Sequence, residues 1–199
     1  KLPQKDKDFT IFGKFLHDIL ENFHKIYSED QSQALNVVMQ RSWKESKEKY
    51  LEKLTPEQIK EAWQYCLEYL KIQADLLKSN KMPKFLCAEK EFNLNINDTI
   101  LLSGFIDKVE QDQDEIIHVS DYKTSKSKKL LASDFFQLKT YGLILALENP
   151  NIKKIRCSYI MIKHNFEYLT KEFSVEELME VPKYYLENSL LIKQEAAYK

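Results

Sequence analysis

The sequence suggests chemistry first at two charged side chains that end an apolar, β-branched segment. The stretch EIIHVSDYKTSKSKK at residues 115–129 carries Asp121 and Lys123 directly after such a run. Side chains alternate between the two faces of a strand, so Asp121 and Lys123 point to the same face as Val119. A carboxylate and an ammonium group are costly to bury unless they pair with each other or with a ligand. The placement predicts either a functional pair or a solvated one.

The preceding apolar segment, LLSGFIDKVE at residues 101–110, supplies a second carboxylate at Asp107. If the two segments form a hairpin around residues 112–114, Asp107 lies opposite or diagonal to Asp121, with Cβ atoms about 5–8 Å apart. Two carboxylates that close repel each other unless they are protonated or bridged by a cation, and an oxygen pair of this kind suits Mg²⁺ or Mn²⁺. Lys123 would then lie within reach of a water molecule or a scissile phosphate.

An ordinary hairpin with solvated charges is the alternative explanation. The chain holds 31 acidic residues and 30 lysines and arginines, so an acid and a base two positions apart also arise by chance, most often on solvated faces. Antiparallel sheets commonly leave one face in water. This alternative predicts that Asp107 and Asp121 lie far apart or on opposite faces, whereas a metal site requires them side by side.

The elements around these residues predict a mixed sheet flanked by helices. Apolar residues at helical spacing predict helices over residues 9–27 and 33–54. A third helix begins at Thr55, where Pro56 occupies the first helical position and Gln58 closes a capping box.

The pattern changes to strands after these helices. The expected strands cover residues 85–96, 99–111, 115–124, 152–164 and 166–174, with a helix at 133–147. A second capping box, Ser174 with Glu177, opens a C-terminal helix. The fold class is therefore α/β or mixed α+β, with a central mixed β-sheet.

Length and composition bound the remaining possibilities. A chain of 199 residues suits one domain, with a helical part at about 9–80, a sheet core at about 84–174 and a C-terminal helix at about 175–199. The net charge of −1 excludes a global basic field but leaves room for a local phosphate-binding patch. No apolar run reaches the ~18 residues of a membrane span, so no membrane partner is expected.

Cysteine usage points to a reducing, cytoplasmic (intracellular) environment. Cys66, Cys87 and Cys157 are odd in number, far apart and without a CxxC pair. Buried thiols are the expected state of such residues, and neither a zinc site nor an Fe–S cluster is expected within this segment.

Several ordered motifs resemble one nuclease family. GFIDKV at 104–109, VSDYKT at 119–124 and QLKTY at 137–141 match the pattern G-x-I-D, (D/E)-Y-K-(T/S) and Q-x-x-x-Y of the RecB/AddB-like branch of the PD-(D/E)XK nuclease superfamily. GKFLHDIL at 13–20 looks like its N-terminal G-x-x-x-H-x-x-L helix, and Glu89 looks like its acidic residue before G-x-I-D. The resemblance spans about residues 12–145 and implies a restriction-endonuclease-like core.

The resemblance implies metal ligands and catalytic residues. Asp107, Asp121 and the main-chain carbonyl of Tyr122 would hold one or two Mg²⁺ or Mn²⁺ ions. Lys123 would orient or deprotonate the attacking water and offset charge on the phosphate. His17 would be a further ligand, although a lone histidine on an amphipathic helix is more often structural.

Two further sets of residues depend on the resemblance. Glu89 would assist the metal or position its water, with Glu91 as a competing candidate on the same strand. Gln137 and Tyr141 share one helical face and would contact Lys123, water or DNA. The residues expected to bind substrate are Gln137, Tyr141, Lys126, Lys128 and Lys129.

The activity implied is metal-dependent hydrolysis of phosphodiester bonds in DNA, as an exonuclease or single-strand endonuclease in recombination, repair or DNA processing. DNA is the expected partner, together with a helicase or another DNA-processing protein. A catalytically inactive domain of the same fold that binds DNA or acts as a scaffold is the alternative. Relatives in this branch often carry a four-cysteine Fe–S cluster, and its cysteine sets are absent from this segment.

Overall fold

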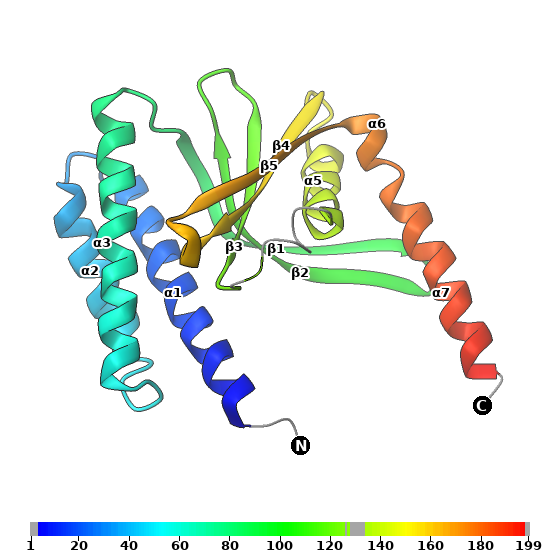
Figure 1. The fold of residues 1–199 in the computed structure, drawn as a ribbon. Helices are drawn as coiled ribbons and strands as arrows, with labels where there is room; N and C mark the ends of the chain where they lie inside the picture. Colours follow the sequence, from blue (N-terminus) through cyan, green and yellow to red (C-terminus); the bar gives the residue numbers. More distant parts are fainter. Residues whose placement is uncertain (1–3, 126, 128–133, 198–199) are drawn as a thin grey trace.

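The computed structural model describes residues 4–125, 127 and 134–197 of the chain. Its elements, in chain order, are α1 (Gln4–Glu29), α2 (Leu35–Lys47), α3 (Pro56–Lys78), β1 (Lys84–Asn97), β2 (Ile100–Gln111), β3 (Ile117–Lys123), α5 (Phe136–Glu148), β4 (Lys154–Met161), a 3₁₀ turn (Ile162–His164), β5 (Glu167–Ser174), α6 (Val175–Leu178) and α7 (Val181–Ala197). Figure 1 shows α1–α3 on one side of the sheet and α5–α7 on the other.

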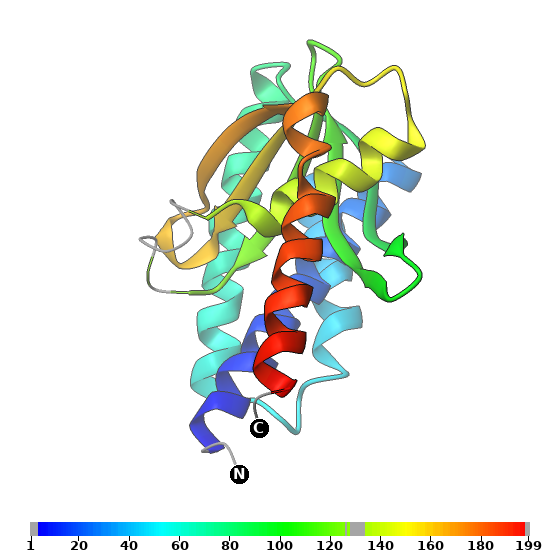
Figure 2. The ribbon, with the colours of Figure 1, turned by 90° about the vertical axis from the view of Figure 1, so that its right-hand side faces the viewer.

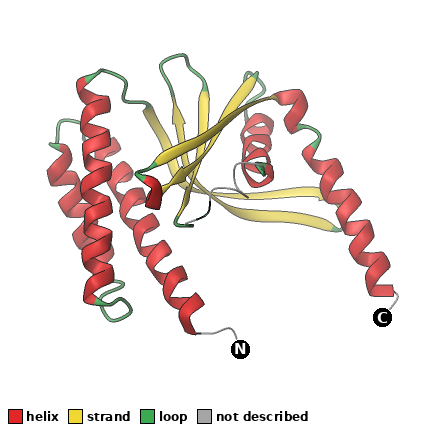
Figure 3. Cartoon of the chain, in the orientation of Figure 1, coloured by secondary structure: helices red, strands yellow, loops and turns green. Residues whose placement is uncertain are grey.

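The sheet is mixed, as predicted. Its strands lie in the order β1-β2-β3-β4-β5, and every neighbouring pair is antiparallel except β3 and β4, which are parallel. Two parallel strands that follow each other along the chain need a crossover connection, and α5 lies within this one. Helices on both faces are clear when the cartoon is coloured by secondary structure (Figure 3).

Two apolar cores hold these layers together. One joins α1–α3 to the sheet through side chains that include Phe15, Phe23, Tyr69 and Tyr122. The other joins α5 and α6 to the opposite face, around residues such as Leu138 and Val119. Viewed from the right-hand side of Figure 1, α6 and α7 cross in front of the sheet (Figure 2). None of the helices in the described part of the chain is long and apolar enough to cross a membrane.

Both predicted capping boxes are present, but two predicted helix ends differ from the structure. Thr55 caps α3 and Ser174 caps α6, each with the reciprocal side-chain bond. The predicted helix 33–54 ends at Lys47, and the turns that follow bring Tyr50 against α1, where its ring packs on Phe15 at 5.2 Å and its hydroxyl donates to Asp18. The predicted C-terminal helix is interrupted after one turn, and a second helix begins at Val181, because Pro182 cannot continue the hydrogen bonding of the preceding turn.

A fork opens within the sheet between β2 and β3. These strands pair only from Lys108 with Ser120 to Gln111 with Ile117. Residues 100–106 of β2 pair with β1 and not with β3, while β3 continues beside β4 up to Lys123. In Figure 1 the long β1–β2 hairpin consequently leaves the sheet and runs beneath α5 toward α7.

Candidate active site

The two predicted carboxylates lie on either side of this fork. The last β2–β3 pair is Lys108 with Ser120, so Asp107 and Asp121 each follow one position beyond it. The charge of Asp107 acts on Asp121, which is 3% exposed. An ordinary hairpin with two solvated carboxylates is therefore wrong for this part of the chain.

Asp107 connects β3 to the first helix. Its Oδ2 accepts a hydrogen bond of 2.8 Å from the main-chain N–H of Tyr122 and lies 3.4 Å from Nδ1 of His17. The carboxylate thus satisfies a β3 donor at the point where β2 no longer pairs with it. Three residues that the motifs single out are brought together by this one side chain.

Asp121 forms an ion pair with Lys123, and Lys123 is in turn held by α5. The Oδ2 of Asp121 lies 2.6 Å from Nζ of Lys123, a short contact between opposite charges that serves as the partner of this buried oxygen. Nζ of Lys123 donates to Oε1 of Gln137 at 3.0 Å, and Nε2 of Gln137 donates to the hydroxyl of Tyr141 at 2.7 Å. The lysine is fixed between a carboxylate and an amide, on the helical face predicted for Gln137 and Tyr141.

Glu89 reaches the same region through an unusual backbone conformation. The β1 pairs on either side of it are Ala88 with Lys108 and Lys90 with Ile106, so Glu89 stands across from Asp107. Its φ is 47°, a left-handed value that L-residues adopt only at a cost. The competing candidate Glu91 is exposed and pairs with Phe105, so the structure places Glu89 nearer to the carboxylates.

All three acids are held in surroundings that disfavour their charged forms. Burial raises the pKa of Asp121 and of Asp107, and the charge of Asp107 raises the pKa of Asp121 further, against the opposing effect of Lys123. Burial also raises the pKa of Glu89 to about 7, with added repulsion from Glu21 and Asp107. Carboxylates crowded in this way gain from a positive charge placed among them.

His17 is presented to the fork by a close approach of α1 to the end of β3. A Cβ atom on Gly13 would come within 3.2 Å of Oγ1 of Thr124, so the absence of a side chain lets the helix pack there. One turn later, the ring of His17 packs edge-on to Tyr122 at 5.7 Å. Burial lowers the pKa of His17, which favours the neutral imidazole that binds metals.

One charged residue near the site was not assigned a role from the sequence. Glu21 lies one helical turn after His17 and forms an ion pair with Lys25. Its negative charge raises the pKa of both Asp107 and Glu89. The signal was present in the sequence, because residues four apart share a helical face. The predicted lysines Lys126, Lys128 and Lys129 lie outside the described residues.

The donor set fits a divalent cation, although its ligands are not gathered into a closed shell. Within the described residues, no three His, Cys, Asp or Glu side chains form a ready-made metal site. Asp107 and Asp121 nevertheless offer two crowded carboxylates, and the charge of Asp107 raises the pKa of Asp121. Together with the carbonyl of Tyr122 and the imidazole of His17, these oxygen-rich ligands suit Mg²⁺ or Mn²⁺.

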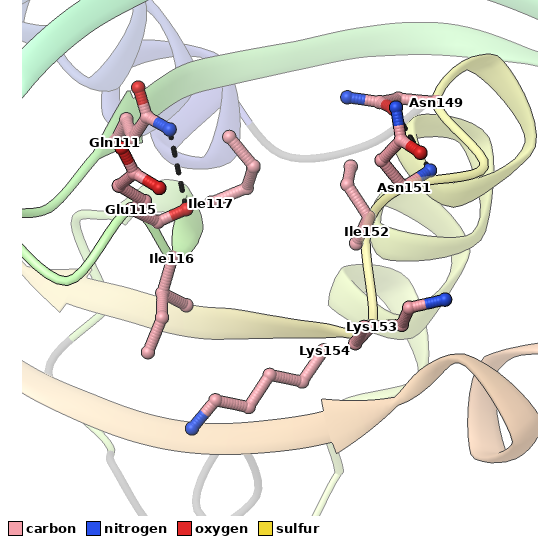
Figure 4. Close-up of a pocket in the computed structure, with 9 residues that line it drawn as sticks. All are labelled: Gln111, Glu115, Ile116, Ile117, Asn149, Asn151, Ile152, Lys153 and Lys154. Carbon is pink, nitrogen blue, oxygen red and sulfur yellow. Dashed lines mark hydrogen bonds between the residues drawn. The ribbon is translucent and has the colours of Figure 1, made fainter.

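A hollow of about 360 Å³ at the other end of the sheet is not part of this site. Its lining residues are Gln111, Glu115, Ile116, Ile117, Asn149, Asn151, Ile152, Lys153 and Lys154 (Figure 4). Ile117 and Lys154 begin β3 and β4, whereas Asp121 and Lys123 lie at the end of β3. The candidate site and this hollow therefore lie at opposite ends of β3.

Comparison with known proteins gives two kinds of match. A family model described as the PD-(D/E)XK nuclease superfamily matches residues 1–196. The chain is also 24% identical over 123 residues to an ATP-dependent helicase/deoxyribonuclease subunit of Streptococcus pyogenes serotype M6 (strain ATCC BAA-946 / MGAS10394), and 23% identical over 123 residues to that of serotype M3 (strain ATCC BAA-595 / MGAS315). Each alignment covers 61% of this chain and 11% of the relative.

Proposed function

Because the chain belongs to the PD-(D/E)XK nuclease superfamily, we propose that it hydrolyses phosphodiester bonds in DNA with the help of Mg²⁺ or Mn²⁺. The single observation that supports this most strongly is the crowding of two largely buried carboxylates, Asp107 and Asp121, beside Lys123. Asp121 is almost fully buried, the charge of Asp107 raises its pKa, and Lys123, which Gln137 fixes, lies 2.6 Å from its Oδ2. A carboxylate is kept in such surroundings when a cation or a reacting group completes them.

Asp107, Asp121, the carbonyl of Tyr122 and His17 would hold the ion. The ion would supply Lewis-acid stabilisation of charge on the phosphate and would lower the pKa of a water molecule. Asp107 also links β3 to α1, because its carboxylate contacts both the N–H of Tyr122 and the ring of His17.

Lys123 would act on the phosphate and on the attacking water. Its ammonium group is already positioned by Gln137, so little reorganisation is needed when a phosphate oxygen arrives. Glu89 would position the water from the β1 side of the fork, and Tyr141 would keep Gln137 in place. Lys123 ends β3, and Gln137 and Tyr141 continue a chain of hydrogen bonds from it along α5.

The relatives described above supply the biological setting that we propose. They are named as helicase/deoxyribonuclease proteins, so we propose that this chain processes DNA in recombination or repair, as an exonuclease or a single-strand endonuclease. A helicase, in the same longer protein or in a partner, would deliver the DNA to the fork inside the cell.

Metal removal tests the proposed activity directly. Labelled single- and double-stranded DNA incubated with the protein should be cut in Mn²⁺ or Mg²⁺ and remain intact in EDTA, because the crowded carboxylates need a cation to bind a polyanion. Gel electrophoresis of the products measures the cleavage. Cleavage that persists in EDTA would contradict the metal-dependent mechanism, and DNA binding without cleavage would favour an inactive DNA-binding domain.

The packing of α1 gives a second prediction. Gly13→Val should lower the cleavage rate roughly 10-fold, because a misplacement of about 1 Å at a reacting group can cost up to ~100-fold and the new side chain would press α1 away from Thr124. Cleavage rate and melting temperature should be measured together, with Lys14→Val on the exposed side of α1 as the control. A Gly13→Val protein as active as the wild type would show that His17 does not depend on this close approach.

A further inference from the structure

A second hollow, of about 540 Å³, begins where the candidate site ends. It lies between the outer half of the β1–β2 hairpin and α5, and one residue of α7 closes it. Its lining residues are Phe92, Leu101, Leu102, Ser103, Gly104, Asp134, Phe136, Gln137, Thr140, Tyr141 and Tyr185. Figure 1 shows the arrangement, with the hairpin running beneath α5 toward α7.

Aromatic rings make up much of this lining. Phe136 packs against Tyr185 with ring centroids 5.1 Å apart and against Tyr184, which is half exposed, at 4.0 Å. On the inner side, Phe92 packs against Tyr141 at 5.8 Å. Phe92 and Tyr141 are buried, whereas Phe136 and Tyr185 are partly exposed, so the latter two rings can stack with nucleic-acid bases, each of which offers a π-face.

The polar groups of the hollow do not favour phosphates. Asp134 is its one charged lining residue among those the structure describes, and it is acidic. The hydroxyl of Thr140 is already engaged, with the main-chain carbonyl of Phe136 and the hydroxyl of Tyr185. A DNA strand would therefore place uncharged bases here and keep its phosphates elsewhere.

Two side chains join the hollow to the candidate site. Gln137 and Tyr141 both line the hollow, and Gln137 also accepts a hydrogen bond from Lys123. The hollow therefore begins one hydrogen bond away from Lys123. The aromatic lining begins on the same helical face that fixes the lysine.

From this continuity we propose that the hollow binds unstacked bases of the DNA strand whose phosphate lies at Lys123. The inference rests on the proposed nuclease function and narrows its substrate to an unpaired strand. Bases in an intact duplex are stacked on one another and paired, so their faces are not available to Phe136 and Tyr185. A single strand, or the frayed end of a duplex, offers them without that cost.

The proposal can be tested by replacing an aromatic side chain with leucine, which removes the ring but stays apolar. Phe136→Leu and Tyr185→Leu should each raise the Kd for a fluorescein-labelled oligothymidylate by roughly 5- to 100-fold, the range expected for one lost stacking partner. Phe136→Tyr and Tyr185→Phe keep a ring and should bind as the wild type does. Tyr65→Leu, a partly exposed tyrosine on α3, is the matched control and should leave the Kd unchanged.

Fluorescence anisotropy in Ca²⁺ buffer should be compared with the cleavage rate in Mn²⁺, so that binding and activity are measured separately. At saturating oligothymidylate the leucine variants should cut nearly as fast as the wild type. If the wild type binds the oligothymidylate but does not cut it, the proposed activity is wrong. The Kd values of the leucine and aromatic variants would still show whether the oligothymidylate binds in this hollow. If a leucine variant fails to fold, Ser103→Glu, which brings a negative charge to the hollow from an exposed position, should weaken binding in its place.

Three results would overturn the inference. They are leucine variants that bind as the wild type does, a wild type that does not bind the oligothymidylate, and a wild type that binds a blunt duplex as tightly as the single strand.

Discussion

Replacement of Lys123 by alanine should reduce DNA cleavage by about 10²–10³-fold, the usual cost of removing one prepositioned donor at a reacting group. Lys123 is the cation that Gln137 fixes beside the buried carboxylate of Asp121. Without it, charge that develops on the phosphate loses a partner. The rate should be measured in single-turnover reactions on labelled single-stranded DNA with Mn²⁺.

Lys154, a lysine that also forms an ion pair but lies away from the site, provides the control for the loss of Lys123. Lys154 also forms an ion pair, with Glu172 at 3.0 Å, but it lies at the start of β4, far along the sheet from the fork. Lys154→Ala should cut DNA at the wild-type rate. If Lys123→Ala cuts DNA as fast as the wild type, Lys123 has no part in the mechanism. If Mn²⁺ raises the melting temperature of Lys123→Ala as much as that of the wild type, the metal ligands remain intact in the variant.

The second large effect concerns the carboxylate shared between β3 and α1. Asp107→Asn should abolish detectable cleavage, a loss of at least ~10³-fold if a metal ligand is removed, and should also abolish the rise in melting temperature that Mn²⁺ produces in the wild type. The amide oxygen can still accept the hydrogen bond from the N–H of Tyr122, so the fold should survive. Asp114→Asn, in the exposed turn before β3, is the matched control.

In EDTA the same substitution should make the protein more stable. Burial raises the pKa of Asp107 above its value in the unfolded chain, so the folded state loses stability as the pH rises from the unfolded pKa through the folded one. At pH 7.5 the carboxylate is charged, and removing that charge should stabilise the fold by on the order of 1 kcal/mol. A melting temperature that falls in EDTA would show that Asp107 serves the fold rather than a cation.

Much of the site could be predicted because its signals are local. Alternation along a strand placed Asp121 and Lys123 on one face, and an i, i+4 spacing placed Gln137 beside Tyr141. The structure has both arrangements. Capping boxes depend only on neighbouring residues, and both predicted boxes are present.

Other features depend on contacts between distant segments. The left-handed φ of Glu89 follows from how β1 passes Asp107, and no local pattern specifies it. The turns after α2 place Tyr50 on Phe15 of α1, a contact between segments that the local helical pattern does not specify. The fork between β2 and β3 is likewise a tertiary feature, since the apolar pattern of β2 continues through residues that no longer pair with β3. Pro182, by contrast, was a readable signal for the break before α7.

The order of the elements also determines when the fork can be completed during synthesis of the chain. The parts of the fork come from α1, β2, β3 and α5, which are widely spaced along the chain. Closing such long loops costs conformational entropy, which only contacts formed later in folding repay. A nascent chain on the ribosome carries both carboxylates before α5 has emerged, but it lacks the amide that fixes Lys123. Gln137 can therefore hold Lys123 beside Asp121 only after α5 has been made and has packed near the end of β3.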